Sequence, residues 1–302
     1  MNDYVLAFDV GGTAIKAGIV RSDGCLEGDI HMYPSLARDS KEAILEHLAA
    51  LVVAQAKRIP AGMRIRGVGL AFPGPFDYER GICQIRGLNK FEAIYGVNLK
   101  EELAARTADH PELRGRWSSA PAYAFENDAG LFALGECAFG VGRELRSALV
   151  LMLGTGLGSS FVRNGQLVKD DPAVPPQGWL YAMPYQDSMM DDYFSRRGIM
   201  RLAKEMGIED IAEGDDDVKQ LAERARSGEF LPAELFRLFG KQLKDALLPY
   251  ISSFSPDAVI IGGQIARSAD LFVPEHMGGV PVHISAEMSA STLKGVCRLF
   301  IN

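Results

Sequence analysis

The sequence predicts an α/β fold in two domains. Apolar segments of strand length alternate with amphipathic segments of helix length, a pattern typical of sheets covered by helices. A short unit also occurs twice, at residues 4–24 and 148–165. Each copy is an apolar strand, a turn rich in glycine and threonine, a second strand, and an Asp-Gly or Asn-Gly turn. Two copies, rather than three or more, favour a duplicated domain over a solenoid.

The length and composition of the chain fit this prediction. The chain has 302 residues, of which 47% are hydrophobic and 24% charged, and it is long for one core. Its net charge of −7 argues against a nucleic-acid surface, which needs a basic stripe. The 4 cysteines are scattered and form no Cys-x-x-Cys pair. We therefore expect neither a disulfide framework nor a zinc cluster built from cysteines.

Neither a membrane span nor a signal peptide is expected. No apolar run approaches the length of a membrane span. The first three residues, Met1-Asn2-Asp3, lack the basic and apolar regions of a signal peptide. We therefore expect a reduced, cytoplasmic protein whose partner is a small molecule, not a membrane or a nucleic acid.

The first domain is predicted as three antiparallel strands, a helix and a fourth strand. Apolar residues 4–8 and 15–20 flank the first turn, and residues 26–33 are expected to form the third strand. Asp39 is expected to cap a helix over residues 40–58, with Glu42 completing a capping box. Residues 65–72 then read as a buried strand, which Pro73-Gly74-Pro75 ends.

The second domain is expected to repeat this order after a polar segment. Residues 107–118 are polar and contain a proline and a glycine, so we place the boundary there. The prediction is an N-terminal domain of residues 1–118 plus 285–302 and a C-terminal domain of residues 119–284. Helices are expected over residues 129–139, 191–206 and 232–254, the last interrupted near Pro249, and over residues 290–300 at the end.

The first turn, Asp9-Val10-Gly11-Gly12-Thr13, has the composition of a phosphate-binding loop. Two adjacent glycines leave no Cβ to block a ligand, and their N–H groups and the Thr13 hydroxyl can point at an anion. Asp9 is placed to hold Mg²⁺, directly or through water. An ordinary glycine-rich hairpin turn, with Asp9 as a local cap, is the alternative.

The second turn, Gly154-Thr155-Gly156, stands at the same place in the second copy of the repeat. Two such turns facing each other across a cleft would suit a nucleoside triphosphate. A third glycine turn, Gly262-Gly263, follows another apolar strand.

Five motifs stand in the order seen in ROK-family sugar kinases, and the sequence resembles that family over nearly its whole length. They are residues 9–16, residues 69–75 followed by Asp77, residues 126–128 with 133–136, residues 153–158 and residues 260–263. The resemblance implies an α/β fold of two ribonuclease-H-like (actin-like ATPase) domains with a central cleft. Some members of the family are repressors with an N-terminal helix-turn-helix, for which this sequence has no room before residue 9.

The resemblance also implies roles for individual residues. Asp128 would be the general base that takes the proton of a sugar hydroxyl, although it could equally cap the helix that follows it. Asn89 and Asn127 would bind sugar hydroxyls, or serve only as loop amides, and Gly74 would line the substrate site. ATP and Mg²⁺ would be held by residues of the glycine turns, namely Asp9, Gly11, Gly12, Thr13, Lys16, Gly154, Thr155, Gly156, Gly262 and Gly263. A homodimer is expected on the same ground.

The sequence departs from the family where sugar and zinc are usually bound. ROK kinases carry Gly-Glu-x-Gly-His followed by a cysteine motif, whereas here Trp179 replaces the glutamate and Ala182 the histidine. The cysteine motif is missing, so no zinc site is expected. Asp191 stands where a sugar-binding glutamate normally sits. Trp179 would stack on a sugar ring or fill the space that the zinc loop leaves.

Together these observations predict an ATP-dependent kinase that phosphorylates a hydroxyl of a hexose or an amino sugar. The alternative is a non-catalytic sugar- or nucleotide-binding protein on the same scaffold, which the altered segment 178–184 favours. The retained Asp9, Asp128 and both glycine turns favour the kinase.

Overall fold

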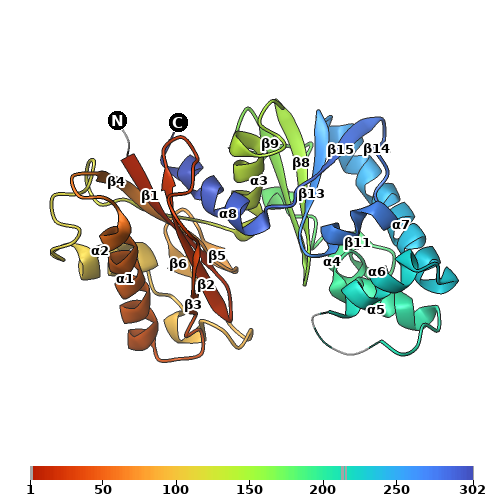
Figure 1. Cartoon of the computed structure of the whole chain (residues 1–302), viewed down its shortest axis with the longest axis horizontal. Coiled ribbons are helices and arrows are strands. Elements are labelled where there is room, and N and C mark those ends of the chain that lie inside the picture. The colour runs from red at the N-terminus through yellow and green to blue at the C-terminus, as the bar shows by residue number, and fades with distance from the viewer. Residues whose placement is uncertain (1–2, 212–213, 215, 302) are drawn as a thin grey trace. The chain divides into compact units, whose positions relative to one another are not determined.

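The computed structural model describes residues 3–211, 214 and 216–301 (Figure 1). The chain divides into two compact units. Unit 1 comprises residues 1–139 and 289–302, and unit 2 comprises residues 140–288. The predicted boundary at residue 118 therefore lies inside unit 1. Residues 119–139 belong to unit 1 because their strand pairs with a strand of its sheet and their helix packs on its last helix.

Unit 1 is built on a five-stranded sheet with the order β3-β2-β1-β4-β7. Strands β1 to β3 are antiparallel, while β4 and β7 run parallel to β1. The strands are β1 (Asp3–Val10), β2 (Ala14–Arg21), β3 (His31–Pro34), β4 (Arg64–Ala71) and β7 (Tyr123–Glu126). The third strand is shorter than the predicted residues 26–33, because Gly28 has a φ of +68° and interrupts the extended backbone.

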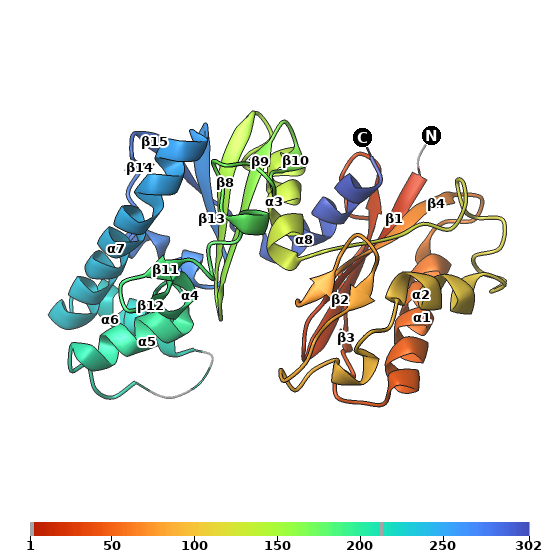
Figure 2. The ribbon, with the colours of Figure 1, turned by 180° about the vertical axis from the view of Figure 1, so that it is seen from behind.

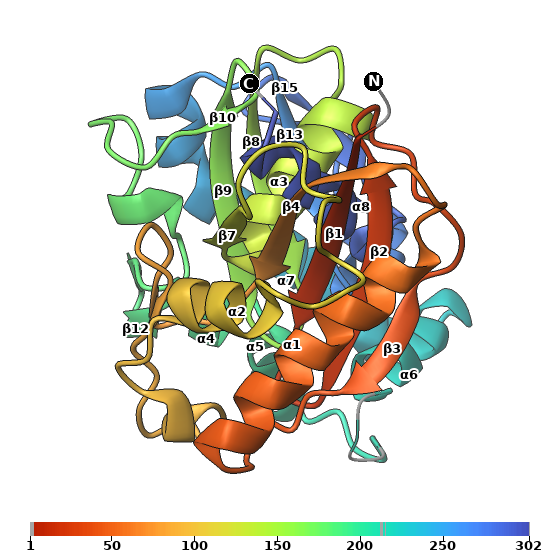
Figure 3. The ribbon, with the colours of Figure 1, turned by 90° about the vertical axis from the view of Figure 1, so that its left-hand side faces the viewer.

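Helices cover both faces of this sheet (Figures 1 and 3). Helices α1 (Lys41–Arg58) and α2 (Leu99–Thr107) lie on one face, where Leu6 and Phe8 of β1 share a buried cluster with leucines of α1. Helix α8 (Met288–Val296) lies on the other face. Glycines there bring it close: a Cβ on Gly69 would lie 2.3 Å from the Val296 side chain.

Helix α3 (Asp128–Phe139) packs on α8 so closely that the two backbones are in contact. A Cβ on Gly135 would lie 1.9 Å from the Ser291 carbonyl oxygen, and one on Gly295 would lie 1.8 Å from the Leu131 carbonyl oxygen. Beside this crossing, the Ser291 hydroxyl donates to the buried Glu136 carboxylate at 2.5 Å. The crossing fixes α3, and with it the position of Asp128 at the start of the helix.

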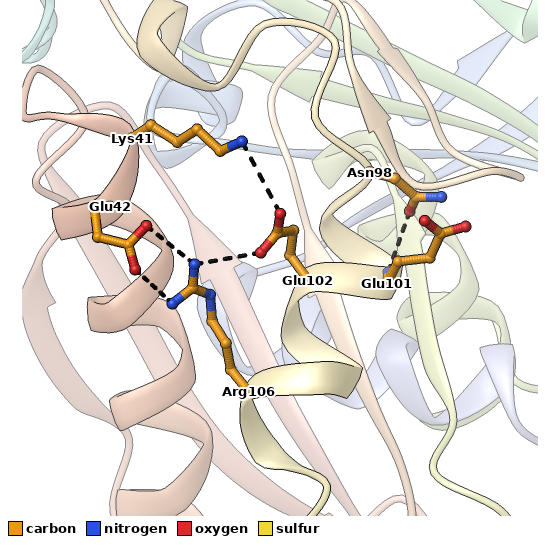
Figure 4. Close-up of polar contacts among 6 residues, drawn as sticks. All are labelled: Lys41, Glu42, Asn98, Glu101, Glu102 and Arg106. Atoms are coloured by element: carbon orange, nitrogen blue, oxygen red, sulfur yellow. Dashed lines mark hydrogen bonds and ion pairs between the residues drawn. The ribbon is translucent and has the colours of Figure 1, made fainter.

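The start of α1 differs from the prediction. Ser40, not Asp39, is the N-cap, and its hydroxyl accepts the Ala43 N–H at 3.3 Å. Glu42 instead forms an ion pair with Arg106 of α2 at 2.7 Å, and Arg106 also reaches Glu102 at 3.3 Å (Figure 4). Glu42 is exposed, whereas Arg106 and Glu102 are half-buried, and the network links α1 to α2.

Unit 2 repeats the topology of unit 1, which confirms the predicted duplication. Its sheet has the order β10-β9-β8-β13-β15-β14, with antiparallel strands β8 to β10 followed by β13 and β15 parallel to β8 (Figure 2). The strands are β8 (Ser147–Leu153), β9 (Leu157–Arg163), β10 (Gln166–Leu167), β13 (Ala258–Gly262), β14 (His276–Met277) and β15 (Val280–Ile284).

The helices of unit 2 bury their apolar residues in one cluster with this sheet. They are α4 (Met190–Tyr193), α5 (Arg196–Glu205), α6 (Asp217–Arg226) and α7 (Phe230–Phe254). The predicted helix 191–206 is broken because Ser195 is extended, and α7 continues through Pro249 where an interruption was predicted. The last predicted helix ends early, as α8 gives way to a 3₁₀ turn at Cys297.

Shorter elements complete the chain. Two small antiparallel pairs, β5 (Phe76–Asp77) with β6 (Ile82–Cys83) and β11 (Pro184–Tyr185) with β12 (Ser188–Met189), lie in units 1 and 2 respectively. Across the described residues, no helix is long and apolar enough to cross a membrane.

Candidate active site

The parallel strands of unit 1 bring several predicted residues to one edge of the sheet. In the strand register Asp9 of β1 lies opposite Ala71 of β4, and Ala71 lies opposite Glu126 of β7. Parallel strands end at the same edge. The loop that contains Gly74 and the pair Asn127-Asp128 therefore follow directly beyond Asp9.

The turn between β1 and β2 is held from its carbonyl side. The Gly11 N–H donates to the Ala14 carbonyl at 2.9 Å, which closes the turn. Ser35 donates two further hydrogen bonds to carbonyls of the turn. Its hydroxyl donates to Gly12 at 2.7 Å, and its N–H donates to Thr13 at 3.1 Å. Gly12 and Thr13 are exposed. Hydrogen bonds to its carbonyl oxygens thus hold the turn in place. Gly12 and the hydroxyl-bearing Thr13 remain accessible, as a phosphate-binding turn requires.

Asp9 lies beside this turn, next to the Lys16 ammonium. Its carboxylate is 3.6 Å from the Lys16 ammonium, which also donates to the Ser289 hydroxyl at 2.9 Å. Burial raises the pKa of Asp9 above its usual value, and the neighbouring Asp128 carboxylate raises it further, while Lys16 acts in the opposite direction. Burial thus outweighs the effect of Lys16 on the pKa of Asp9, and a cation such as Mg²⁺ would stabilise the ionised carboxylate.

Asp128 is the first residue of α3 and is exposed on one side. Its carboxylate accepts the Ala129 N–H at 2.9 Å. Although solvent reaches the residue, protein atoms crowd the carboxyl group, and this desolvation raises its pKa. Its own N–H, that of Ala129 and the Lys90 charge only oppose the shift. A carboxylate of raised pKa that solvent can reach is suited to accept a proton from a ligand.

Asn127, not Asp128, caps α3. The Asn127 side-chain oxygen accepts the Gly130 N–H at 2.5 Å, and its amide nitrogen donates to the Glu126 carboxylate at 3.1 Å. Asn127 therefore takes the capping position that was the alternative role for Asp128, whose carboxylate accepts the N–H of the next residue, Ala129. Asn127 is more than a loop amide, because most of its hydrogen-bonding capacity serves the helix start.

The segment that carries Asn89 has an unusual backbone. Asn89 is exposed and has a φ of +54°. Its N–H donates to the Glu92 carboxylate at 2.6 Å, and its carbonyl accepts from Arg38 at 3.2 Å. The next residue, Lys90, extends over Gly12, where a Cβ would lie 3.2 Å from the lysine Cδ. Lys90 belongs to this edge of unit 1, although no motif in the sequence pointed to it.

In unit 2 the predicted glycines also come together. Strands β8 and β13 are parallel neighbours with Gly262 opposite Met152, so the turn after β8 and Gly262-Gly263 share one edge. Gly263 has a φ of +106°, and a Cβ there would lie 2.0 Å from the Leu153 carbonyl oxygen. No other residue fits at this position. The strands therefore meet only because residue 263 is glycine.

Asp191 supports the turn of unit 2. One carboxylate oxygen accepts the Leu157 N–H at 2.6 Å, and the other is paired with Arg197. The turn itself is closed by the Gly154 N–H, which donates to the Gly156 carbonyl at 3.1 Å. A sugar hydroxyl would have to compete for Asp191 with these contacts, because both carboxylate oxygens already have protein partners.

Trp179 lies on a segment that one hydroxyl fixes. Ser159 of β9 donates to the Gly178 carbonyl at 2.8 Å and accepts the Leu180 N–H at 2.7 Å. Trp179 between them is half-buried, with its ring centroid 5.9 Å from that of the exposed Tyr181. Among the described residues, no group of three or more His, Cys, Asp or Glu side chains is arranged to hold a metal.

Comparison with known protein families decides the family. The model of the ROK family matches residues 5–280. The chain belongs to the ROK family. Two curated relatives are similar to it over most of their length. A glucokinase of Thermotoga maritima is 28% identical over 287 residues, 88% of this chain and 84% of that protein. An N-acetyl-D-glucosamine kinase of Mannheimia succiniciproducens is 24% identical, over 97% of this chain and 98% of that protein.

Solved structures confirm the fold of this ROK-family chain. A sugar kinase structure from Cytophaga hutchinsonii, described as putative, has a TM-score of 0.78 at 20% identity, covering 99% of this chain and 100% of that one. A Streptomyces griseus ROK glucokinase, solved with glucose and AMPPNP, has a TM-score of 0.68 at 20% identity, covering 98% of this chain and 99% of that one. A ROK transcriptional regulator reaches 0.78 at 15% identity, covering 99% of this chain and 78% of that one.

Proposed function

We propose that this ROK-family carbohydrate kinase transfers the terminal phosphoryl group of ATP to a hydroxyl of a hexose or an amino sugar. The observation that carries the proposal is the edge of unit 1. There Asp128, with its raised pKa, lies near Asp9 and the turn that contains Gly11, Gly12 and Thr13. A base, a cation ligand and a phosphate-binding turn are the parts that phosphoryl transfer needs.

Asp128 is assigned the role of general base. Its carboxylate takes the proton of the sugar hydroxyl as the hydroxyl oxygen attacks the terminal phosphorus. The raised pKa makes this carboxylate a stronger base than an ordinary aspartate. Asn127 caps α3 and so keeps Asp128 at the helix start, and its remaining amide N–H can reach a sugar hydroxyl.

Asp9 is assigned to Mg²⁺, held directly or through water. The ion would neutralise charge on the phosphate oxygens, and it would also supply the compensation that Asp9 lacks. Lys16 stands on the other side of this carboxylate, held by Ser289, and we assign it to the nucleotide phosphates.

The remaining predicted residues except Asp191 keep their roles within this proposal. In unit 2, Gly154, Thr155, Gly156, Gly262 and Gly263 contact the nucleotide. Trp179 presents an aromatic face for a sugar ring, and Asn89 and Gly74 of unit 1 border the sugar. Asp191 acts on the sugar only indirectly, since it holds the turn at Leu157.

A coupled assay of ADP release tests the proposal. Purified protein with Mg-ATP is screened against glucose, N-acetylglucosamine, β-glucosides and fructose, the sugars named in the similar kinases. We expect turnover with at least one sugar, and Asp128→Asn should lower kcat about 10²- to 10⁴-fold, the range for loss of a general base. Asparagine keeps an oxygen for the Ala129 N–H, so the melting temperature should not fall.

A non-catalytic sugar-binding protein is the second candidate. The substitution of Trp179 and Ala182 for the usual sugar-binding residues favours it, as does the fold shared with a ROK regulator. Sugars that raise the melting temperature without any ADP release would support this candidate. Turnover that persists in Asp128→Asn would leave the kinase in place but remove Asp128 from the role of base.

A further inference from the structure

Lys90 is held in place by an anchored and strained segment of unit 1. The residues on both sides of it, Asn89 and Phe91, have φ values of +54° and +57°. Such values cost a non-glycine residue about 1 kcal/mol or more, so they persist only where the surroundings hold them. Phe91 is fully buried, with its ring 5.0 Å from that of Phe72, and its N–H donates to the Ala37 carbonyl at 2.5 Å.

The side chain of Lys90 passes over the phosphate-binding turn. A Cβ on Gly12 would lie 3.2 Å from the Lys90 Cδ, so the aliphatic stem rests on the glycine backbone. The ammonium group at its end is close enough to Asp128 to lower the pKa of that carboxyl group. One cation therefore faces both the turn and the proposed base.

Within the described part of the chain, no carboxylate lies within ion-pair distance of Lys90 and no side chain accepts a hydrogen bond from it. Lys16, the other lysine at this edge, differs: it is 3.6 Å from Asp9 and donates to Ser289 at 2.9 Å. The ammonium of a half-buried lysine that has no ion-pair partner among the described residues, beside an exposed turn, is suited to bind an anion.

We propose that the Lys90 ammonium binds the terminal phosphoryl group of the nucleoside triphosphate. The inference rests on the proposed kinase function and names a residue that this function did not include. During transfer, the bond from the sugar oxygen to phosphorus forms, the bond from phosphorus to the ADP oxygen breaks, and the hydroxyl proton passes to Asp128. Lys90 exchanges no proton and balances the charge on the moving phosphoryl group.

Calorimetric titration with two nucleotides tests this assignment without requiring turnover. Wild type and Lys90→Met are titrated with Mg-AMPPNP, which has the terminal phosphoryl group, and with Mg-ADP, which lacks it. Methionine keeps an apolar stem over Gly12. We expect the affinity for AMPPNP to fall about tenfold or more, as for a lost charged hydrogen bond, and the affinity for ADP to change less than about twofold.

Two further variants serve as controls. Lys100→Met removes an exposed charge from α2 of the same unit, and it should bind both nucleotides like wild type. Lys90→Arg keeps the charge and should recover part of the AMPPNP affinity, which also covers the case that Lys90→Met folds poorly.

The outcomes separate this inference from the function on which it rests. If wild type and Lys90→Met bind AMPPNP with equal affinity, the proposed role of Lys90 is refuted and the kinase function is not affected. An equal loss for both nucleotides also overturns it, because the contact would then not involve the terminal group. Wild type that binds neither nucleotide refutes the proposed kinase function, and the role of Lys90 with it.

Discussion

The two glycine turns occupy equivalent places in two equivalent sheets, yet their surroundings differ in charge. Around the turn of unit 1 lie two carboxylates of raised pKa, Asp9 and Asp128, and Lys90, which has no ion-pair partner among the described residues. Beside the turn of unit 2, both carboxylate oxygens of Asp191 have partners: one accepts the Leu157 N–H and the other is paired with Arg197.

This difference distinguishes a turn whose neighbours can react with a ligand from a turn whose neighbours hold the backbone. Asp9 and Asp128 each have a protein contact, but burial still raises the pKa of both carboxyl groups. Both oxygens of Asp191 are instead engaged in holding the turn and pairing with Arg197. We therefore assign the chemistry to the edge of unit 1. In unit 2 the same supersecondary structure serves as a fixed turn.

The largest effect on stability is expected at the edge of unit 2. Gly263→Ala would place a Cβ 2.0 Å from the Leu153 carbonyl oxygen at a φ of +106°. Strain of this kind, with a clash against backbone, should lower the free energy of unfolding by about 3 kcal/mol or more. Urea unfolding followed by circular dichroism measures it.

Gly154→Ala is the matched control for this variant. No atom lies within 4 Å of a Cβ at that position, and the change should stay within about 1 kcal/mol. Equal stabilities of the two variants would contradict the close contact of the strand ends in unit 2.

A smaller effect is expected from Asp191→Ala. The Leu157 N–H would lose its acceptor, and an unsatisfied donor that is partly buried costs about 1–3 kcal/mol. The neighbouring Asp192→Ala loses an exposed ion pair to Arg197 and a bond from Ser188, and should cost less, about 1 kcal/mol or below. If Asp192→Ala is the more damaging of the two in urea, Asp191 does not support the turn.

The smallest effect is expected in unit 1, where replacing Asp128 should raise the stability of the folded protein by an amount that depends on pH. The folded protein keeps a proton on Asp128 to higher pH than the unfolded chain, so ionisation of this carboxyl group destabilises the folded state. That cost is absent well below the usual pKa of 3.8 and grows as the pH rises through the higher, folded value.

Asp128→Asn should therefore melt slightly higher than wild type at pH 7, and the difference should vanish in acid. Differential scanning calorimetry across this pH range measures both melting temperatures. The shift includes the response of Asp9, whose pKa Asp128 raises, and of Lys90, which faces the same carboxylate. A wild type that melts above the variant at pH 7 would show that Asp128 is stabilised, not destabilised, by its surroundings.

Much of the fold and part of the site could be predicted because they depend on local pattern. Strand periodicity and the repeated glycine turns gave the two sheets, and the position of Asp128 after β7 placed it at the edge shared with Asp9. The boundary at residue 118 was misplaced because a polar loop resembles a linker. Its neighbours nevertheless pair within unit 1, and long-range pairing has no local signal.

Individual side-chain roles were harder to predict. Asn127 and Asp128 are both good capping residues, and only the hydrogen bond to Gly130 shows which of them caps α3. Lys90 gave no signal at all. Its place over Gly12 depends on two residues of positive φ and on the burial of Phe91.

By itself the sequence determined which strands and turns form, because alternation of apolar residues and adjacent glycines act over a few neighbouring positions. Only the tertiary structure decided which charged groups have partners, because those partners come from distant parts of the chain. Asp191 pairs with Arg197, whereas Lys90 has no ion-pair partner in the part of the chain that the structure describes. That contrast arises from packing between elements, which no local pattern records.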